Sequence, residues 1–297
     1  MKKKILVSGS SGFVGKRVVA ALKKKGYPVR EFDLDKGLDL LRETDCRKAV
    51  KEIDLVIHGA AILDEDSPLL WQVNVNGTEN LIKAAAEGKV ERFIHLSTAG
   101  IHGNQKGKVS EKSAVEPVTV YEKSKAAAEK IVEDYQEMIE STVIRPAIVL
   151  GANDHWKKII RLMEKDFPLI GNGKNKWQTV YVDDLVDAIV FCAEHDKTAG
   201  EIFIVAEEKA LSLESLYVEL KKALGLEPKM WKIPFWSGKI LAFFYATFSP
   251  KSIVNLAHLE RLNRNREYSI AKIKKTGWKP KFDAEQGIKR TVKEVGK

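Results

Sequence analysis

A glycine-rich turn near the start of the chain constrains the fold more than any other feature. Residues 4–8 form an apolar run, Gly9, Gly12 and Gly15 follow it, and residues 13–25 carry apolar side chains at helical spacing. Small residues let such a turn bend tightly and let its backbone approach a phosphate group, and the helix N-terminus behind it favours anions. The pattern predicts a strand, a phosphate-binding turn and a helix.

Strands and helices alternate through the first half of the chain. Apolar runs predict further strands at residues 29–33, 53–58, 91–97 and 141–150, and helical spacing recurs at residues 45–52, 68–87 and around Tyr121. Alternation of this kind implies a parallel sheet with right-handed crossovers. We therefore predict an α/β fold, a Rossmann-type doubly wound parallel sheet, over residues 1–150.

The second half changes character. We predict a strand at residues 177–182, a helix capped by Asp183, a strand at residues 201–206 and a helix at residues 212–224 capped by Ser212. No long Pro/Gly/Ser linker separates the two halves. Residues 151–297 are therefore expected to form a smaller, mixed substrate-binding lobe that packs closely on the first.

Tyr121 and Lys125 have the spacing of a proton-transfer pair. Positions i and i+4 share a helix face, so a phenol would lie beside an ammonium. A free tyrosine titrates at about pH 10, too high for a good base at neutral pH, and a cation about 4 Å away lowers that pKa. An amphipathic surface helix with an incidental tyrosine and lysine is the alternative if the pair stands alone.

Adjacent hydroxyls at Ser97 and Thr98 end the fourth predicted strand, so the pair does not stand alone. In open α/β sheets, ligands bind at the C-terminal ends of the strands. A hydroxyl in this place would hold the oxygen of a substrate while Tyr121 moves its proton.

Asp33 ends the second predicted strand, 18 residues after Gly15. A carboxylate in this place accepts hydrogen bonds from an adenosine ribose and repels a 2′-phosphate. The sequence therefore favours NAD over NADP as cofactor. NADP stays open, because Lys36 and Arg42 lie nearby in sequence and would offset the repulsion. A surface aspartate at a strand end is the alternative.

Taken together, several segments resemble the extended short-chain dehydrogenase/reductase family, also called the NAD-dependent epimerase/dehydratase family, over nearly the whole length. The glycine turn has two residues in its first gap, as in this family. Other matching segments lie at residues 58–61, 74–78, 95–103, 121–125, 145–149 and 181–185. The resemblance implies a Rossmann-type fold, a dinucleotide cofactor and hydride transfer.

The resemblance also implies roles for individual residues. Tyr121 is the general acid/base, Lys125 anchors the nicotinamide ribose and lowers the tyrosine pKa, and Thr98 supplies the hydroxyl. Thr98 is preferred to Ser97 because it lies five residues before Gly103, as the family's hydroxyl residue usually does. The implied cofactor contacts are Gly9, Ser11, Gly12, Phe13, Val14, Gly15, Asp33, Asp39, Leu40, Gly59, Ala60, Ala61, Asn74, Tyr121, Lys125 and Pro146.

A homodimer is a further implication, formed through helices near residues 68–87 and 118–137. His102 departs from the family pattern, which usually has a tyrosine before this glycine. We expect the change to reshape the pocket without removing a catalytic group.

The second half of the sequence gives little information about the substrate. Nucleotide-sugar enzymes of the family commonly have an asparagine soon after the fifth-strand arginine and an arginine before the Val-x-Asp segment, and this sequence has neither. Residues 171–175 and 181–183 look closer to the 3β-hydroxysteroid dehydrogenase and dihydroflavonol reductase branches. The resemblance points to an apolar or less charged alcohol or ketone.

Aromatic and aliphatic residues crowd into residues 231–248. Three interpretations compete: a buried lobe helix, a lid over the substrate pocket and an interfacial membrane helix. Lys232, Pro234 and Lys239 interrupt the stretch, so it is too short to be a transmembrane segment. The basic residues that follow it would suit an acidic lipid surface, namely Lys251, Arg261, Arg264 and Arg266.

Composition sets limits on the class of protein. Cys46 and Cys192 are too few and too far apart for a disulfide framework or a metal cluster. The first apolar run is too short for a signal peptide, so we expect a cytoplasmic protein. The net charge of +9 is spread along the chain without an arginine-rich arm, zinc spacing or an RNP-like motif, which argues against a nucleic-acid partner.

Three functions compete for this sequence. The leading hypothesis is an NAD-dependent oxidoreductase of a small-molecule hydroxy or keto substrate. The second is a nucleotide-sugar epimerase or dehydratase that keeps its NAD bound. The third is an NAD(P)-sensing binding protein without chemistry, and Tyr121, Lys125 and Thr98 together argue against it.

Overall fold

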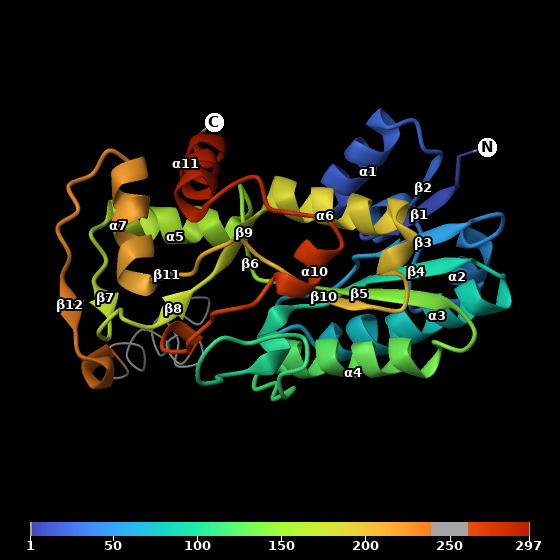
Figure 1. Cartoon of the computed structure of the whole chain (residues 1–297), viewed down its shortest axis with the longest axis horizontal. Helices are drawn as coiled ribbons and strands as arrows, with labels where there is room; N and C mark the ends of the chain where they lie inside the picture. Colours follow the sequence, from blue (N-terminus) through green and yellow to red (C-terminus); the bar gives the residue numbers. More distant parts are fainter. Residues whose placement is uncertain (1, 239–260, 297) are drawn as a thin grey trace.

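The computed structural model describes residues 2–238 and 261–296 (Figure 1). Its larger part is built around a parallel sheet of six strands. From one edge to the other the strands are β10 (Ile202–Val205), β5 (Glu140–Pro146), β4 (Arg92–Leu96), β3 (Leu55–His58), β1 (Ile5–Ser8) and β2 (Val29–Phe32). Each neighbouring pair is parallel. Because the strands are parallel, their C-terminal ends meet at one edge of the sheet.

Helices cover both faces of this sheet. Figure 1 shows α1 (Gly15–Lys24) and α6 (Val182–Glu194) on one face. On the other face lie α2 (Glu43–Ala49), α3 (Gly77–Glu87) and α4 (Val120–Asp134). This arrangement confirms the predicted doubly wound α/β fold.

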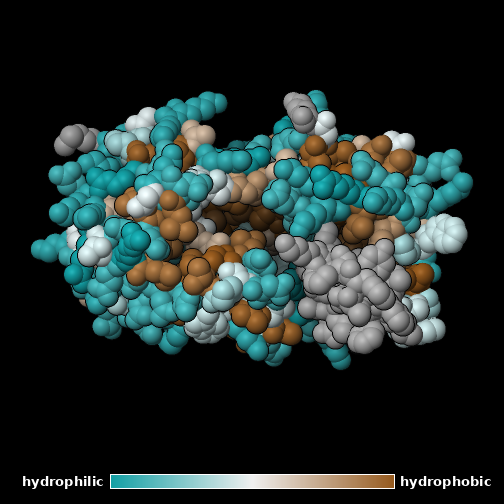
Figure 2. All heavy atoms as spheres, turned by 180° about the vertical axis from the view of Figure 1, so that it is seen from behind, coloured by the Kyte–Doolittle hydropathy of each residue, from teal (hydrophilic) through white to brown (hydrophobic). Residues whose placement is uncertain are grey.

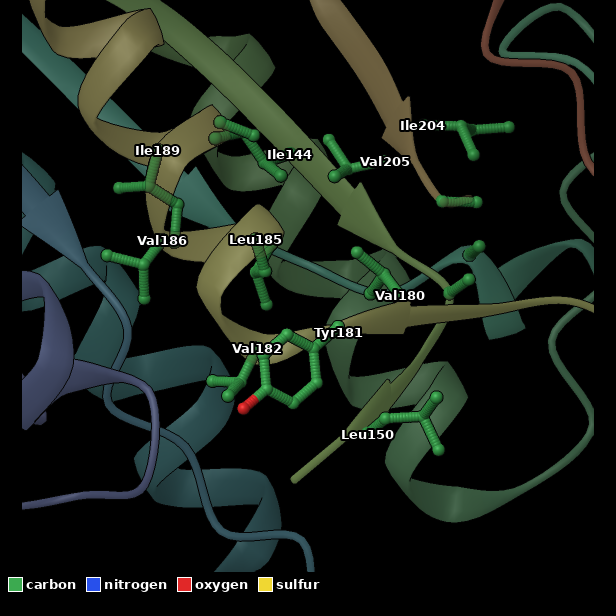
Figure 3. Packing of buried hydrophobic residues seen from close by; sticks show 14 of the residues in the cluster. Ile144, Leu150, Val180, Tyr181, Val182, Leu185, Val186, Ile189, Ile204 and Val205 are labelled. Carbon is green, nitrogen blue, oxygen red and sulfur yellow. The ribbon is translucent and has the colours of Figure 1, made fainter. Parts of the chain in front are cut away.

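The packing of α6 on the sheet explains why β5 and β10 contain apolar runs in the sequence. Leu185 and Ile189 of α6 lie in one cluster with Ile144 of β5 and Val205 of β10, and all four side chains are fully buried (Figure 3). A parallel strand covered on both faces carries a continuous apolar run. Burial of each such side chain contributes about 1.5–3 kcal/mol to folding.

The remaining elements form a smaller lobe beside the C-terminal ends of the strands (Figure 1). Three pairs of short strands lie there among the described residues. They are β6 (Ile148–Leu150) with β9 (Thr179–Tyr181), β8 (Lys176–Trp177) with β11 (Leu211–Ser212), and β7 (Leu169–Ile170) with β12 (Lys232–Ile233). Helices α5 (Asp154–Glu164), α7 (Leu213–Ala223) and α11 (Ala284–Val295) also lie in this part, and α10 (Ala271–Lys275) packs near β10.

The strand predicted at residues 201–206 does not belong to the smaller lobe. As β10 it pairs with β5, from Ile202 opposite Val143 to Val205 opposite Pro146. Its apolar run is typical of a buried parallel strand, and α6 supplies the crossover from the first half. The main sheet thus takes one edge strand from the second half, and the division at residue 150 stays a prediction.

Helix starts were predicted with mixed success. Ser212 caps α7 as expected, because its hydroxyl accepts a hydrogen bond from the Ser215 amide. The predicted cap at Asp183 is wrong: Tyr181 is the N-cap residue of α6, without a side-chain cap, and Asp183 lies in the first turn. The predicted helix at residues 68–87 contains a π-helical turn, η2 (Gln72–Asn76), directly before α3.

Glu207 follows β10 and is a buried carboxyl, only 3% exposed. Its Oε1 accepts hydrogen bonds from the Thr179 amide, at 2.9 Å, and from the Thr179 hydroxyl. Burial raises the pKa of Glu207 from an ordinary 4.5 to about 7. A raised carboxyl pKa means that folding loses stability as the pH rises from the unfolded-state pKa through the folded-state pKa.

Glu207→Gln keeps an acceptor for Thr179 and removes this titration. We expect the variant to gain stability over the natural protein between pH 5 and 8, by up to about 3 kcal/mol at the upper end. Urea unfolding at several pH values measures the difference, with Glu208→Gln at the neighbouring, half-exposed carboxylate as control. A difference that does not change with pH would contradict the prediction.

Candidate active site

The C-terminal edge of the sheet gathers most of the predicted site. The glycine turn follows β1, residues 59–61 follow β3, Ser97 and Thr98 follow β4, and Pro146 ends β5. Figure 2 shows the molecule hollowed near its middle, with apolar residues at the bottom of the hollow. The predicted residues are therefore brought to one region by parallel strands that end together.

The glycine turn is too tight for side chains. Gly9 has a φ of +70°, and a Cβ there would lie 2.7 Å from the Cα of Ala60. A Cβ at Gly15 would lie 1.9 Å from the carbonyl oxygen of Gly9. Helix α1 starts behind this turn without a side-chain cap and with no acidic residue in its first turn.

These features fit a dinucleotide phosphate. The uncapped N-terminus of α1 leaves amides and a partial positive charge to face an anion. The hydroxyl of Ser10, in the turn itself, is buried without a hydrogen-bond partner among the described residues. A buried polar group without a partner fits a site that a ligand completes.

Asp33 is joined directly to the glycine turn. Its carboxylate accepts a hydrogen bond from the Ser11 amide at 2.9 Å and another from the Asp35 amide at 3.3 Å. The carboxylate is therefore held beside the turn rather than free at a surface. Its ribose contact stays a prediction.

Asp39 and Leu40 lie further along, between β2 and α2. The Asp39 carboxylate accepts a hydrogen bond from the Leu41 amide at 2.9 Å. The Leu40 side chain is buried against Gly77 of α3, and its carbonyl accepts a bond from Asn80. Leu40 thus has a structural place in the core, and the cofactor contact of both residues stays a prediction.

Asn74 connects two parts of the site. Its amide group exchanges two hydrogen bonds with the backbone of Ile62, at 2.8 and 2.9 Å, and donates a third to the Ser124 hydroxyl at 3.0 Å. Ser124 in turn donates to the Tyr121 carbonyl at 2.8 Å. Asn74 therefore holds the loop after β3 against the first turn of α4. Sequence reasoning overlooked Ser124, which lies inside the Tyr121 motif.

Helix α4 carries Tyr121 and Lys125 one turn apart. Thr119 and Glu122 form a capping box at its start, which fixes the direction of the first turn. Tyr121 is partly exposed, while Lys125 is only 2% exposed. Burial lowers the pKa of the Lys125 ammonium to about 8.

Lys125 is not among the groups that shift the pKa of Tyr121 in this structure, and its effect on the tyrosine stays a prediction. Removal from water raises the pKa of Tyr121 to about 12, and the carboxylates of Glu122 and Glu65 add to the rise. Glu65 lies close enough for its Oε1 to accept a hydrogen bond from the Tyr121 amide at 3.4 Å. The phenol is thus protonated at neutral pH.

Thr98 is the N-cap of a short helix, η3 (Ala99–His102), and its hydroxyl accepts a bond from the Gly100 amide at 3.1 Å. The hydroxyl hydrogen remains free to donate to another group. Ser97 is 4% exposed, and its hydroxyl has no partner within the described part of the chain. The more accessible Thr98 fits the hydroxyl role better.

A buried ion pair between β5 and α4 holds α4 and η3 in place. Arg145 of β5 binds Glu129 of α4 through Nε and Nη2, with a shortest distance of 2.6 Å. Arg145 also donates to His102 Nε2 at 3.2 Å, and His102 Nδ1 donates to the Ala114 carbonyl at 2.9 Å. His102, the departure from the family pattern, therefore joins η3 to α4 through Arg145.

The segment that follows the undescribed residues lies against the site. Arg264 donates to both carboxylate oxygens of Glu122, at 2.8 and 3.1 Å, in a pair that is 7% exposed on each side. Arg261 binds Glu65. The predicted suitability of Arg264 for a lipid surface is therefore wrong, because Arg264 is buried against Glu122, while that of Arg261, which is a quarter exposed, stays a prediction.

Residues 231–248 are described only as far as residue 238, and the rest of this stretch lies outside the described residues. Trp231 and Trp236 are 74% and 68% exposed. The three interpretations of the stretch stay predictions.

Comparison with protein families decides the class of this protein. The family model described as "NAD dependent epimerase/dehydratase family" matches residues 5–206. The chain belongs to this family. Membership confirms the predicted resemblance, and the chain is accordingly an enzyme of a family that uses a nicotinamide dinucleotide.

Relatives in the family have different named activities. UDP-glucose 4-epimerase of Vibrio cholerae is 31% identical over 98% of this chain and 95% of the relative. The 3 beta-hydroxysteroid dehydrogenase/Delta 5→4-isomerase of Mycobacterium tuberculosis is 26% identical over 96% and 88%. A structure of UDP-glucuronic acid 4-epimerase from Bacillus cereus with UDP-glucuronic acid and NAD has a TM-score of 0.80 at 23% identity, covering 99% of both chains. The similarity to this solved structure supports the fold described for the chain.

Proposed function

We propose that this enzyme is an NAD-dependent oxidoreductase of a hydroxy or keto substrate in which Tyr121 is the general acid/base. One observation carries the proposal: Tyr121 and Lys125 share a face of α4, and the first turn of α4 packs against η3, which Thr98 caps. The three groups that resemblance assigns to the chemistry thus come from neighbouring elements at one edge of the sheet.

In the proposed reduction, the Thr98 hydroxyl donates a hydrogen bond to the substrate oxygen and orients it. The Tyr121 phenol, protonated at neutral pH, gives its proton to the same oxygen, although its raised pKa makes it a weaker acid than a free phenol. When bound, the nicotinamide supplies or accepts the hydride. In the reverse direction the deprotonated form of Tyr121 accepts the proton, and the raised pKa keeps that form scarce until a cation approaches it.

The proposed cofactor preference is NAD over NADP. Lys36 lies 3.6 Å from Glu31 and Arg42 lies 4.0 Å from Asp39, so both bases already have carboxylate partners. The Asp33 carboxylate is left to repel a 2′-phosphate. We expect KM for NADP to exceed KM for NAD by about tenfold or more, a difference of about 1.4 kcal/mol.

Asp33→Asn keeps an acceptor for the Ser11 amide and removes the charge, so it should narrow the difference between the two KM values. Lys36→Gln serves as the control on the same loop. A natural enzyme that prefers NADP would refute the assignment.

A nucleotide-sugar epimerase or dehydratase is the second candidate function. The named activity of the Vibrio cholerae relative, at 31% identity, favours it. Such an enzyme returns the hydride to the same molecule and keeps its cofactor, so NAD found in the purified protein would support it. An NADH-fluorescence screen of steroid-like alcohols, ketones, aldehydes and nucleotide sugars separates the two candidates.

A cytoplasmic location and a homodimer are also proposed. No helix in the described part of the chain is long and apolar enough to span a bilayer. Helices α3 and α4 pack side by side on one face of the sheet and would form the dimer contact (Figure 1). Light scattering should give twice the chain mass of 33.3 kDa, and Ala127→Arg on the outer side of α4 should reduce it to one chain. A monomeric natural protein would exclude the dimer.

A further inference from the structure

His58 is a fully buried histidine at the end of β3, with a partner at each ring nitrogen. Its Nδ1 lies 2.6 Å from the Ser8 hydroxyl, and its Nε2 lies 2.9 Å from the Thr78 hydroxyl. The three residues belong to β3, β1 and α3.

The direction of these hydrogen bonds is fixed by their neighbours. Thr78 donates its hydroxyl hydrogen to the Asn74 carbonyl at 2.7 Å, so Thr78 can only accept from His58 Nε2–H. Nδ1 of the neutral ring then accepts from Ser8, whose oxygen accepts in turn from the Ala60 amide at 3.4 Å. A directed chain of hydrogen bonds runs from Ala60 to Asn74.

These hydrogen bonds continue to α4, the helix that carries Tyr121. Asn74 holds Ile62 with two hydrogen bonds and Ser124 with a third, and Ser124 donates to the Tyr121 carbonyl. At the other end, Ala60 lies against Gly9 of the glycine turn. One set of hydrogen bonds thus connects the turn with the first turn of α4.

We propose that His58 is a positioning residue, whose neutral ring fixes Asn74 and through it the Tyr121 turn and the loop after β3. The proposal rests on the function proposed for Tyr121. Only one tautomer of the neutral ring can hydrogen-bond to both hydroxyls, so the ring and its two partners hold one another in a single orientation. Misplacement of a reacting group by about 1 Å costs on the order of 100-fold in rate.

Burial keeps the ring in this state. It lowers the pKa of His58 to about 3, with a further contribution from the charge of Lys125, so the ring stays neutral at working pH. His95 provides a contrast on the neighbouring strand. It is the register partner of His58, with ring centroids 5.3 Å apart, and neither of its ring nitrogens has a partner among the described residues.

His58→Phe keeps an aromatic ring and removes both hydrogen bonds. We expect kcat to fall by on the order of 100-fold, with a smaller rise in KM for the dinucleotide, because Ala60 and Asn74 are predicted cofactor contacts. Amide hydrogen exchange at Ile62 and in the first turn of α4 should rise. His95→Phe is the matched control and should change neither quantity, while His58→Gln, which has a donor and an acceptor, should recover part of the lost kcat.

Should His58→Phe fail to fold, Thr78→Val removes the next hydroxyl in the same chain of hydrogen bonds. This variant must give the same fall in kcat and the same rise in amide exchange. The inference is overturned if His58→Phe or Thr78→Val matches His95→Phe in kcat and exchange. Retained turnover in Tyr121→Phe would instead refute the proposed function, and the exchange measurement would still test His58.

Discussion

Tyr121→Phe should lower the rate of hydride transfer by about 10²- to 10⁴-fold, the usual contribution of a general acid/base. Phenylalanine fills the same space and leaves the hydrogen bonds of the Tyr121 backbone intact, so the only loss is the proton. The glycine turn and Asp33 are untouched, and the affinity for NAD should stay close to that of the natural enzyme.

Stopped-flow NADH fluorescence measures the hydride step, and a fluorescence titration measures the affinity. Tyr135→Phe is a matched control, because Tyr135 ends the same helix and is partly exposed like Tyr121. Turnover in Tyr121→Phe at the level of Tyr135→Phe would remove Tyr121 from the chemistry.

Gly15→Ala should abolish tight NAD binding. The added methyl group would lie 1.9 Å from the Gly9 carbonyl oxygen and 2.7 Å from its carbon, and backbone atoms cannot move aside as a flexible side chain does. Overpacking of this kind costs about 1–3 kcal/mol, so Kd for NAD should rise by about tenfold to 100-fold. The melting temperature should fall by roughly 2–10 °C.

Isothermal titration and thermal unfolding measure the two effects. Gly296→Ala is the control, since its Cβ would lie 3.5 Å from the Val292 carbonyl, an ordinary contact at a helix end. A Gly15→Ala enzyme that binds NAD as tightly as the control would show that the turn can widen without cost.

Local patterns in the sequence predicted the fold of the first half well, because strand, turn and helix signals there are short-range. The run before Gly9 became β1, and the apolar spacing after it became α1. Strand β10 shows the limit. Its apolar run was visible, but the choice between two sheets depends on α6 crossing back over β5, a long-range packing that spacing does not contain.

The candidate site could be predicted as residue types but not as an electrostatic environment. The motif placed Tyr121 and Lys125 on one helix face. It gave no sign that Glu65, from a different loop, would approach the tyrosine and help to raise its pKa. Neither did it show Arg264 beside Glu122, because 142 residues separate the partners in sequence.

The ion pairs of Arg261 and Arg264 have a consequence for the order of synthesis. Their partners Glu65 and Glu122 leave the ribosome long before them, separated by 196 and 142 residues. A buried carboxylate without its partner costs about 3–5 kcal/mol, so Glu122 favours a partly opened site until the late arginine arrives. The emerging chain can therefore complete its dinucleotide turn before the substrate side closes.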